Sequence, residues 1–179
     1  MKKIISVLFI LTIITTQSFG NLLLTRDEAF SIAFPDADSV EKMDIFLNKT
    51  QVEKIEALSY SRLDSKIYIF YKFTNGNDTL GYAVINTHLL RTKSETVMYV
   101  IDNEGRLINA EILAFFEPSE YMQSDKWLEL FANRNLDKNL RIDRDIPNIT
   151  GATITTHAFT ESVRKVLAIF QVAVIRGKN

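Results

Sequence analysis

Five threonines lie between residues 150 and 160, four of them in the stretch ITGATITTHAF, and the first two, Thr150 and Thr153, enclose Gly151 and Ala152. Small residues beside hydroxyl groups let a bulky ligand approach the main chain closely. Successive N–H groups at the start of a helix suit an anion, of which phosphate is the natural example. Threonines also gather at helix N-caps, so a purely structural cap for one or two of these hydroxyls is the alternative.

A helical pattern directly follows these threonines, and Thr155 or Thr156 is expected to cap that helix or to contact a phosphate. The pattern has an apolar stripe at helical spacing, formed by Phe159, Val163, Val166, Leu167 and Phe170. The polar residues between them, Glu161, Arg164 and Lys165, are expected to face water. The hydroxyl cluster therefore stands at the start of an amphipathic C-terminal helix.

Two predicted β-hairpins precede this helix. Residues 66–73 and 79–87 are rich in strand-forming residues and flank a turn cluster, and residues 95–101 and 107–116 flank a second one. Shorter helices are predicted at 26–34, after a Thr25–Glu28 capping box, at 49–58, and at 124–132, where Ser124 is the expected N-cap. The fold class is therefore α+β, an antiparallel sheet of about four strands packed with short helices and the C-terminal amphipathic helix.

Composition excludes several kinds of site. The formal net charge of −1 and a near-neutral balance of charged residues give no support to a nucleic-acid partner. The chain has no cysteine, which excludes disulfides, Cys-ligated iron–sulfur clusters and thioether-linked haem. Its two histidines, His88 and His157, are not in metal-ligand spacing, so no metal site is expected.

The N-terminal twenty residues have the layout of a secretory signal peptide. Lys2 and Lys3 precede an apolar stretch over residues 4–14, and the small-x-small triplet of residues 18–20 follows. The apolar stretch is shorter than the roughly 20 residues of a membrane-spanning helix, so an uncleaved anchor is the weaker alternative. We expect cleavage after Gly20, which leaves one domain over residues 21–179 in the periplasm or another extracytoplasmic space.

The heptapeptide TGATITT resembles the Thr/Ser-Gly-Ala-Thr signature of the FMN-binding domain family, which includes the flavin-carrying subunits of sodium-translocating NADH:quinone reductase and of the Rnf complex. FPDAD, NTHLLRTKSETVMYVID, FFEPSEYMQSDKWLELF and the final helix resemble stand-alone exported members of the family, in the same order. The resemblance implies FMN attached to Thr153 through a phosphodiester bond made by a flavin transferase, with Thr150, Gly151 and Ala152 around it. The acidic residue that usually stands three positions before the signature is replaced here by Pro147, and Asp145 is the nearest acid.

Four further residues are candidates for flavin contacts. The resemblance places the EPSEY loop against the isoalloxazine ring, which makes Glu117 and Tyr121 wall residues, with a plain turn at Pro118 as the alternative. Arg91 could bind the phosphate or a ring carbonyl, or be a surface group paired with Glu95. For His88, a hydrogen bond to the flavin competes with a structural role.

These features predict an exported flavoprotein that passes electrons between a membrane or periplasmic donor and an unknown acceptor. Because no second redox group is apparent, an electron carrier is favoured over an enzyme with its own substrate. One alternative is a flavin-dependent reductase of a small extracytoplasmic substrate, with Glu117 or His88 as proton donor. Another is a cofactor-free binding or structural domain in which the threonines only cap a helix.

Overall fold

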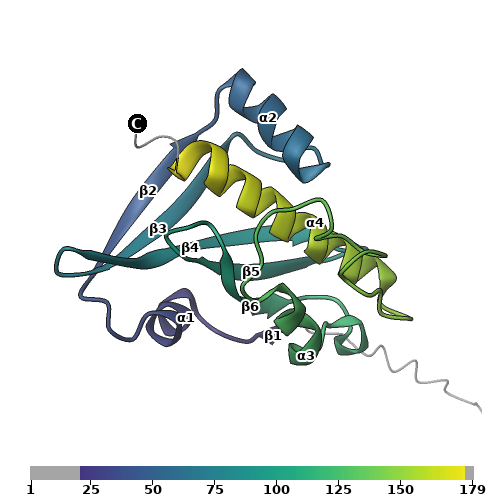
Figure 1. Ribbon diagram of the computed structural model, residues 1–179. Coiled ribbons are helices and arrows are strands. Elements are labelled where there is room, and N and C mark those ends of the chain that lie inside the picture. The colour runs from purple at the N-terminus through teal and green to yellow at the C-terminus, as the bar shows by residue number, and fades with distance from the viewer. Residues whose placement is uncertain (1–20, 176–179) are drawn as a thin grey trace, which may run out of the picture.

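The computed structural model describes residues 21–175, so the predicted signal peptide over residues 1–20 lies outside the described residues (Figure 1). In the described range six strands form one antiparallel sheet in the order β1-β6-β5-β4-β3-β2. The strands are β1 (Asn21–Leu22), β2 (Ser39–Phe46), β3 (Ile67–Asn75), β4 (Asp78–Leu89), β5 (Ser94–Ile101) and β6 (Leu107–Phe115). The predicted α+β class and both hairpins are confirmed, and the sheet has six strands where about four were expected.

The two strands missing from the prediction are the edges of the sheet. Strand β2 pairs only with β3, and most of its side chains are exposed, so its apolar residues follow no regular alternation. Strand β1 is two residues long and pairs with the end of β6, which is too short for any sequence pattern to reveal. Edge strands are specified by pairing with a neighbour more than by their own sequence.

Helices cover both faces of the sheet (Figure 1). They are α1 (Arg26–Ala33), α2 (Lys49–Ser59), the short α3 (Asp125–Leu128) and α4 (Thr153–Ile169), with 3-10 turns η1 (Ser119–Tyr121) and η2 (Glu129–Phe131) and a π-helical end η3 (Phe170–Ile175). The Thr25–Glu28 capping box that was predicted for α1 is present, whereas Ser124 precedes α3 without a capping hydrogen bond from its side chain. Asn48 and Gln51 form a second capping box at the start of α2.

The two faces of β5 belong to two separate cores. Val97, Tyr99 and Ile101 point towards α4 and α2 and lie in the main core. Met98 and Val100, on the opposite face of the same strand, pack with α1. A central strand that is buried on both faces holds the middle of the sheet rigidly, and its start lies beside the site described below.

Helix α4 lies across the main face of the sheet, with α2 beside it (Figure 1). The predicted apolar stripe is confirmed, since all five of its members, Phe159, Val163, Val166, Leu167 and Phe170, are at most 2% exposed. Burial extends well beyond the stripe, because Thr155, Thr156, Thr160 and Ser162 are buried as well. Because α4 is buried on most of its sides, packing fixes its position, and its first residues are fixed with it.

The expectation that Arg164 faces water is wrong, because its side chain is 4% exposed. Its guanidinium donates to the carbonyl oxygens of Leu58 at 2.7 Å and of Ser59 at 3.0 Å, at the end of α2. It also donates to the carbonyls of Asp137 at 2.6 Å and Leu140 at 3.0 Å, in the long loop before α4. One cation thus satisfies two orphan carbonyls of a helix C-terminus and ties a loop to the same point. Amphipathic spacing alone could not reveal these backbone partners.

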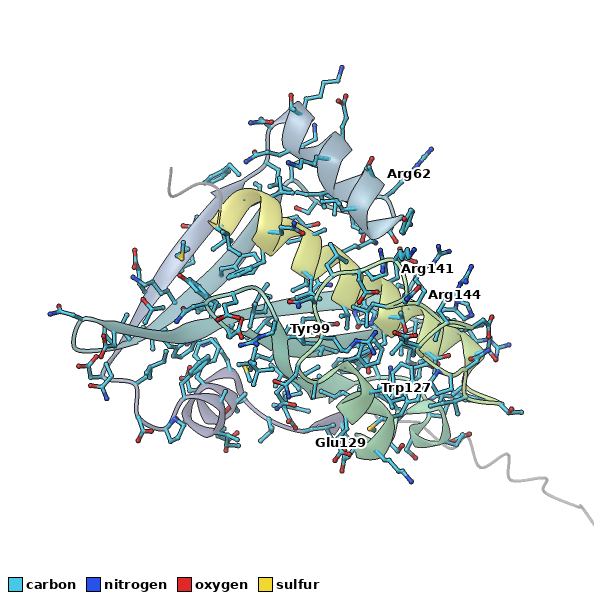
Figure 2. The ribbon with its side chains drawn as sticks, in the orientation of Figure 1. Arg62, Tyr99, Trp127, Glu129, Arg141 and Arg144 are labelled. Carbon is cyan, nitrogen blue, oxygen red and sulfur yellow. The ribbon has the colours of Figure 1, made fainter. Side chains whose placement is uncertain are left out.

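Replacing Arg164 by methionine is expected to lower the free energy of unfolding by about 2 to 4 kcal/mol, because it leaves buried carbonyl groups without donors. Chemical denaturation followed by circular dichroism measures this change. Arg62→Met is the matched control, since Arg62 is exposed just after α2 (Figure 2) and a surface change of this kind costs at most about 0.5 kcal/mol. Equal losses in the two variants would contradict the role given to Arg164.

Candidate functional site

A pocket of about 210 Å³ opens where three segments meet. They are the loop between β4 and β5, the segment after β6 that contains η1, and the start of α4. The lining residues are Arg91, Glu117, Tyr121, Gly151, Ala152, Thr153, Ile154 and Thr155. Seven of these eight residues were predicted as site residues from the sequence, and they come from parts of the chain up to 64 residues apart (91 to 155).

The threonines differ sharply in exposure. Thr155, Thr156 and Thr160 are 4%, 0% and 3% exposed, so these hydroxyls are inside the protein. Thr150 and Thr153 are exposed, but Thr150 is not part of the pocket lining. Of these five described threonines, Thr153 alone combines an exposed side chain with a place in the pocket.

The start of α4 is set by Gly151 and Ala152. Gly151 has a φ of +89°, a backbone conformation that side-chain-bearing residues rarely adopt, and Ala152 is the N-cap. The prediction that Thr155 or Thr156 caps this helix is wrong, because no side chain caps it. The N–H groups of the first turn therefore remain free of a side-chain acceptor at the pocket end, which is the arrangement that binds phosphate.

The segment that leads into the helix is tied down from two sides. The Trp127 indole donates from Nε1 to the carbonyl oxygen of Pro147 at 2.8 Å, and its ring packs edge-on against Phe159 of α4. The Thr156 hydroxyl donates to Oδ1 of Asn148 at 2.7 Å. Pro147 thus helps to hold this segment in place through its backbone carbonyl, not through its side chain. Figure 2 shows Trp127 beside the first half of α4.

Asp145 does not take the place of the missing acidic residue at position 147. Its carboxylate pairs with Arg134 at 2.5 Å, a contact made within the loop that precedes α4. The pocket lining contains no residue of that loop before Gly151. The departure from the family signature at Pro147 is therefore not compensated by this neighbour.

Glu117 fixes the β4–β5 loop to the opposite wall of the pocket. Its Oε1 accepts hydrogen bonds from the backbone N–H of Thr92 at 2.6 Å and of Lys93 at 2.8 Å, and from the Thr92 hydroxyl at 3.1 Å. The Thr92 N–H bond is the main cause that lowers the pKa of Glu117 below its ordinary value. Because these bonds hold the loop that contains Arg91, Glu117 positions Arg91. A carboxylate with a lowered pKa that accepts three hydrogen bonds is ill suited to donate a proton.

Three predicted site residues lie outside the pocket lining: Thr150, Thr156 and His88. Thr156 supports the site through Asn148, whereas His88 lines a different cavity and contacts Glu95. The expected pairing of Glu95 with Arg91 is therefore not found. One lining residue was missed, Ile154, whose 51% exposed side chain falls off the buried stripe of α4. An apolar residue outside the apolar stripe was the sequence signal that could have identified Ile154 as a lining residue.

The residues present fit FMN. The first turn of α4 and Arg91 suit its phosphate, Thr153 offers a hydroxyl at the same point, and Tyr121 and Ile154 offer apolar surface to the ring. Pockets that enclose small ligands usually measure about 300–1,000 Å³. At about 210 Å³ this pocket is smaller than that range.

Comparison with known families agrees with this geometry. The family model of the FMN-binding domain matches residues 92–168, which run from the residue after Arg91 through most of α4. The resemblance seen in the sequence is thereby confirmed over residues 92–168, where the chain matches the model of this family. No curated protein matches the chain.

The described residues contain neither a membrane-spanning helix nor a metal-binding cluster. Between residues 21 and 175 no helix has the length and apolar character needed to cross a membrane. In the same range no three His, Asp or Glu side chains gather as a metal site requires.

Replacing Glu117 by glutamine is expected to destabilise the protein at pH 7. A carboxyl group whose pKa is lowered by folding stabilises the native state above its unfolded pKa, which is about 4.3. That contribution is lost as the pH falls through the lower native pKa. The stability difference between wild type and Glu117→Gln should therefore be constant from pH 5 to 7 and shrink below about pH 4.3.

Denaturant titrations at a series of pH values measure this difference. Glu120→Gln is the matched control, because Glu120 lies three residues later with an exposed side chain. A difference that stays constant down to pH 2, or an equal one in the control, would refute the anchoring role of Glu117.

Proposed function

We propose that this FMN-binding domain carries its flavin covalently, through a phosphodiester bond to Oγ1 of Thr153, and that the protein acts as an electron carrier outside the cytoplasm. The observation that carries the proposal is the combination found at Thr153, an exposed hydroxyl at the N-terminus of α4 and in the pocket wall. The other hydroxyls of the signature region are either buried or outside the lining.

The attachment needs a separate flavin transferase, because a threonine hydroxyl is too weakly acidic to act as a nucleophile unaided. With FAD as donor, Oγ1 of Thr153 forms the bond to the phosphorus of the FMN half, the pyrophosphate bond breaks, and AMP leaves with the proton balance completed by solvent. Among residues 21–175, Oγ1 accepts one hydrogen bond, from the Asn148 amide at a long 3.5 Å, and the exposed hydroxyl is therefore open to such an enzyme.

After attachment the residues of this chain hold and orient the phosphate end. The first turn of α4 provides backbone donors, and Arg91, held by the loop that Glu117 anchors, provides a cation on the opposite wall. Bound FMN supplies one- and two-electron redox chemistry. A pocket of this size would cover only part of a bound flavin, and an accessible flavin would favour exchange of electrons with protein partners over conversion of an enclosed substrate.

Export and the partners are part of the same proposal. The basic and apolar pattern of residues 1–20 supports a signal peptide, and therefore a location in the periplasm or an equivalent space. There the protein would take electrons from a membrane or periplasmic donor and pass them to an acceptor, after maturation by the flavin transferase. An enzyme with its own small substrate would need a more enclosed pocket than the one observed.

Intact mass of the denatured, desalted protein tests the covalent bond, with the protein taken from its native envelope or from a host that co-expresses a flavin transferase. Wild type should gain the mass of one FMN less one water, and Thr153→Ala should gain nothing. Thr150→Ala is the matched control, because it removes the other exposed hydroxyl of the signature and should leave the added mass unchanged. Wild type without added mass, or a loss of flavin in Thr150→Ala alone, would overturn the assignment.

A further inference from the structure

A cavity of about 140 Å³ lies between the end of α2, the loop before α4 and the middle of α4. Two arginines, Arg141 and Arg164, line it together with Tyr60 and His157, and we call it the arginine cavity. None of its lining residues belongs to the pocket at the start of α4. The two are separate sites along one helix, and flavin binding makes no use of the arginine cavity.

Tyr60 has an unusual backbone conformation at the end of α2. Its φ is +58°, in the left-handed region that glycine or asparagine normally occupies after a helix. Its side chain is 61% exposed, so burial of the ring does not account for a bulky residue at this position. The ring instead contacts two cations, since the guanidinium carbon of Arg141 lies 4.9 Å from its centroid and that of Arg164 lies 5.0 Å from it. A strained backbone that is kept at such a place indicates a functional constraint.

The positive charge of these two arginines is not neutralised by a carboxylate. Between residues 21 and 175 neither guanidinium forms an ion pair. The acceptors of Arg164 are backbone carbonyl oxygens, and the charged contact of Arg141 is the ring of Tyr60. Burial, and after it the charge of Arg141, lowers the pKa of Arg164 below its ordinary value. Both groups nevertheless remain cations in a protein, so they repel each other across the cavity.

The acids nearby are engaged elsewhere. Glu161 belongs to the cavity lining, but its carboxylate lies 3.0 Å from Nζ of Lys165. The carboxylate of Asp137 accepts two backbone N–H groups of its own loop, at 2.6 and 3.0 Å. Asp143 follows Arg141 by two residues and is not part of the lining. The cavity therefore has two cations in its wall and one carboxylate, which it shares with Lys165.

Hydrogen-bond donors are left over at the cavity. Arg164 uses four of its five side-chain N–H groups on carbonyl oxygens, which leaves one on Nη2. In the described part of the chain no acceptor binds the side-chain N–H groups of Arg141. The hydroxyl of Ser61 and the imidazole of His157 add donors that carry no charge. These donors come from three segments of the chain, so they surround a ligand from several sides.

The size of the cavity limits what it can hold. One water molecule occupies about 30 Å³ in the liquid, so about 140 Å³ accommodates a group of a few heavy atoms and excludes a ring system such as a flavin. Two cations suit a group with two negative charges, and donors from several sides suit a tetrahedral one more than a planar one. Phosphate has both properties, whereas a carboxylate has one charge and is flat.

We propose that the arginine cavity binds a phosphate group, either inorganic phosphate or the phosphate of a small phosphomonoester. Arg141 is the main contact, because its guanidinium presents a planar set of unused donors that matches two oxygens of the anion. The ring of Tyr60 holds that guanidinium in place, and Arg164 adds charge from inside the protein. The bound anion offsets the repulsion between the two cations.

This binding site does not depend on the flavin, but its test must distinguish two places where phosphate is expected. In flavin-free protein the first turn of α4 and Arg91 also attract phosphate. The backbone amide of Gly151 reports on that pocket, and the backbone amides of Ser61 and Arg141 report on the arginine cavity. Nitrogen-15 NMR titration of the folded protein with inorganic phosphate, at constant ionic strength, follows all three signals separately.

Wild type should show saturable shifts at Ser61 and Arg141. Arg141→Met should weaken the binding reported by Ser61 by about tenfold or more, because it removes charge-assisted hydrogen bonds. Arg91→Met should change the Gly151 response and leave that of Ser61 as it is. Shifts at Ser61 that do not saturate, or that saturate equally in Arg141→Met, would overturn the proposal.

Arg144→Met is the matched control for Arg141→Met. Arg144 follows Arg141 by three residues, is exposed, and lies outside the lining. Figure 2 shows both side chains projecting outward from the loop before α4. Arg144→Met should bind phosphate as wild type does. An equal loss in the two variants would reduce the effect to general surface charge and contradict a defined site.

Stability gives a second readout through linkage. A ligand that binds the folded protein raises its free energy of unfolding, so phosphate should stabilise wild type more than sodium chloride of equal ionic strength. Phosphate also strengthens folding in general, and that part should be the same in wild type and Arg141→Met. The excess stabilisation should therefore be absent in Arg141→Met. An identical response of the two proteins would refute binding at Arg141.

Two further ligands and one further variant define the site. Glycerol phosphate that displaces inorganic phosphate indicates a phosphomonoester as the source of the group, and binding of inorganic phosphate alone indicates the free ion. Acetate that binds as tightly as phosphate would contradict the choice of a dianion. Tyr60→Gly suits the left-handed backbone and should remain folded by circular dichroism, yet bind phosphate more weakly. Unchanged affinity in this variant would contradict the role given to the ring.

Discussion

The burial of α4 against the sheet is the constraint on which the rest of the structure depends. Phe159, Val163 and Val166 fix the helix on β4 and β5, and Arg164 joins it to the end of α2 and to the loop before it. Because the helix cannot move independently, its first turn stays at the tip of the β4–β5 hairpin. The pocket exists because the N-terminus of one buried helix meets one hairpin loop and the segment after β6.

The same packing separates hydroxyl groups with nearly the same local sequence. Thr155 and Thr156 are buried in the first turn of α4, whereas Thr153, the first residue of the helix, remains at the surface. In the proposed attachment, selectivity for one acceptor would therefore follow from the orientation of the helix. A transferase that meets the folded domain would find one hydroxyl of this cluster beside the phosphate-binding end of α4, which is the basis of the proposed attachment.

Local signals in the sequence predicted most of the fold. The capping box at Thr25, the turn clusters of both hairpins and the apolar stripe of α4 each act within a few residues, so they are readable without tertiary information. Strand β2 and the buried Arg164 were not predictable in this way, since the first depends on pairing with β3 and the second on backbone carbonyls from α2 and a distant loop. For the site, the threonine signature located one wall. Glu117 and Tyr121 were reached through family resemblance and Arg91 through the donors of its guanidinium, because the proximity of these residues to that signature is a consequence of the folded sheet.

The most direct test of the central claim is to locate the flavin on the chain. Trypsin cleavage after Arg144 and Arg164 releases one peptide, residues 145–164, which contains all five threonines of the cluster and no internal basic cleavage site. Tandem mass spectrometry of this peptide from the matured protein should place one FMN phosphate on Thr153. An unmodified peptide from a flavin-containing protein, or FMN on a different threonine, would contradict the account.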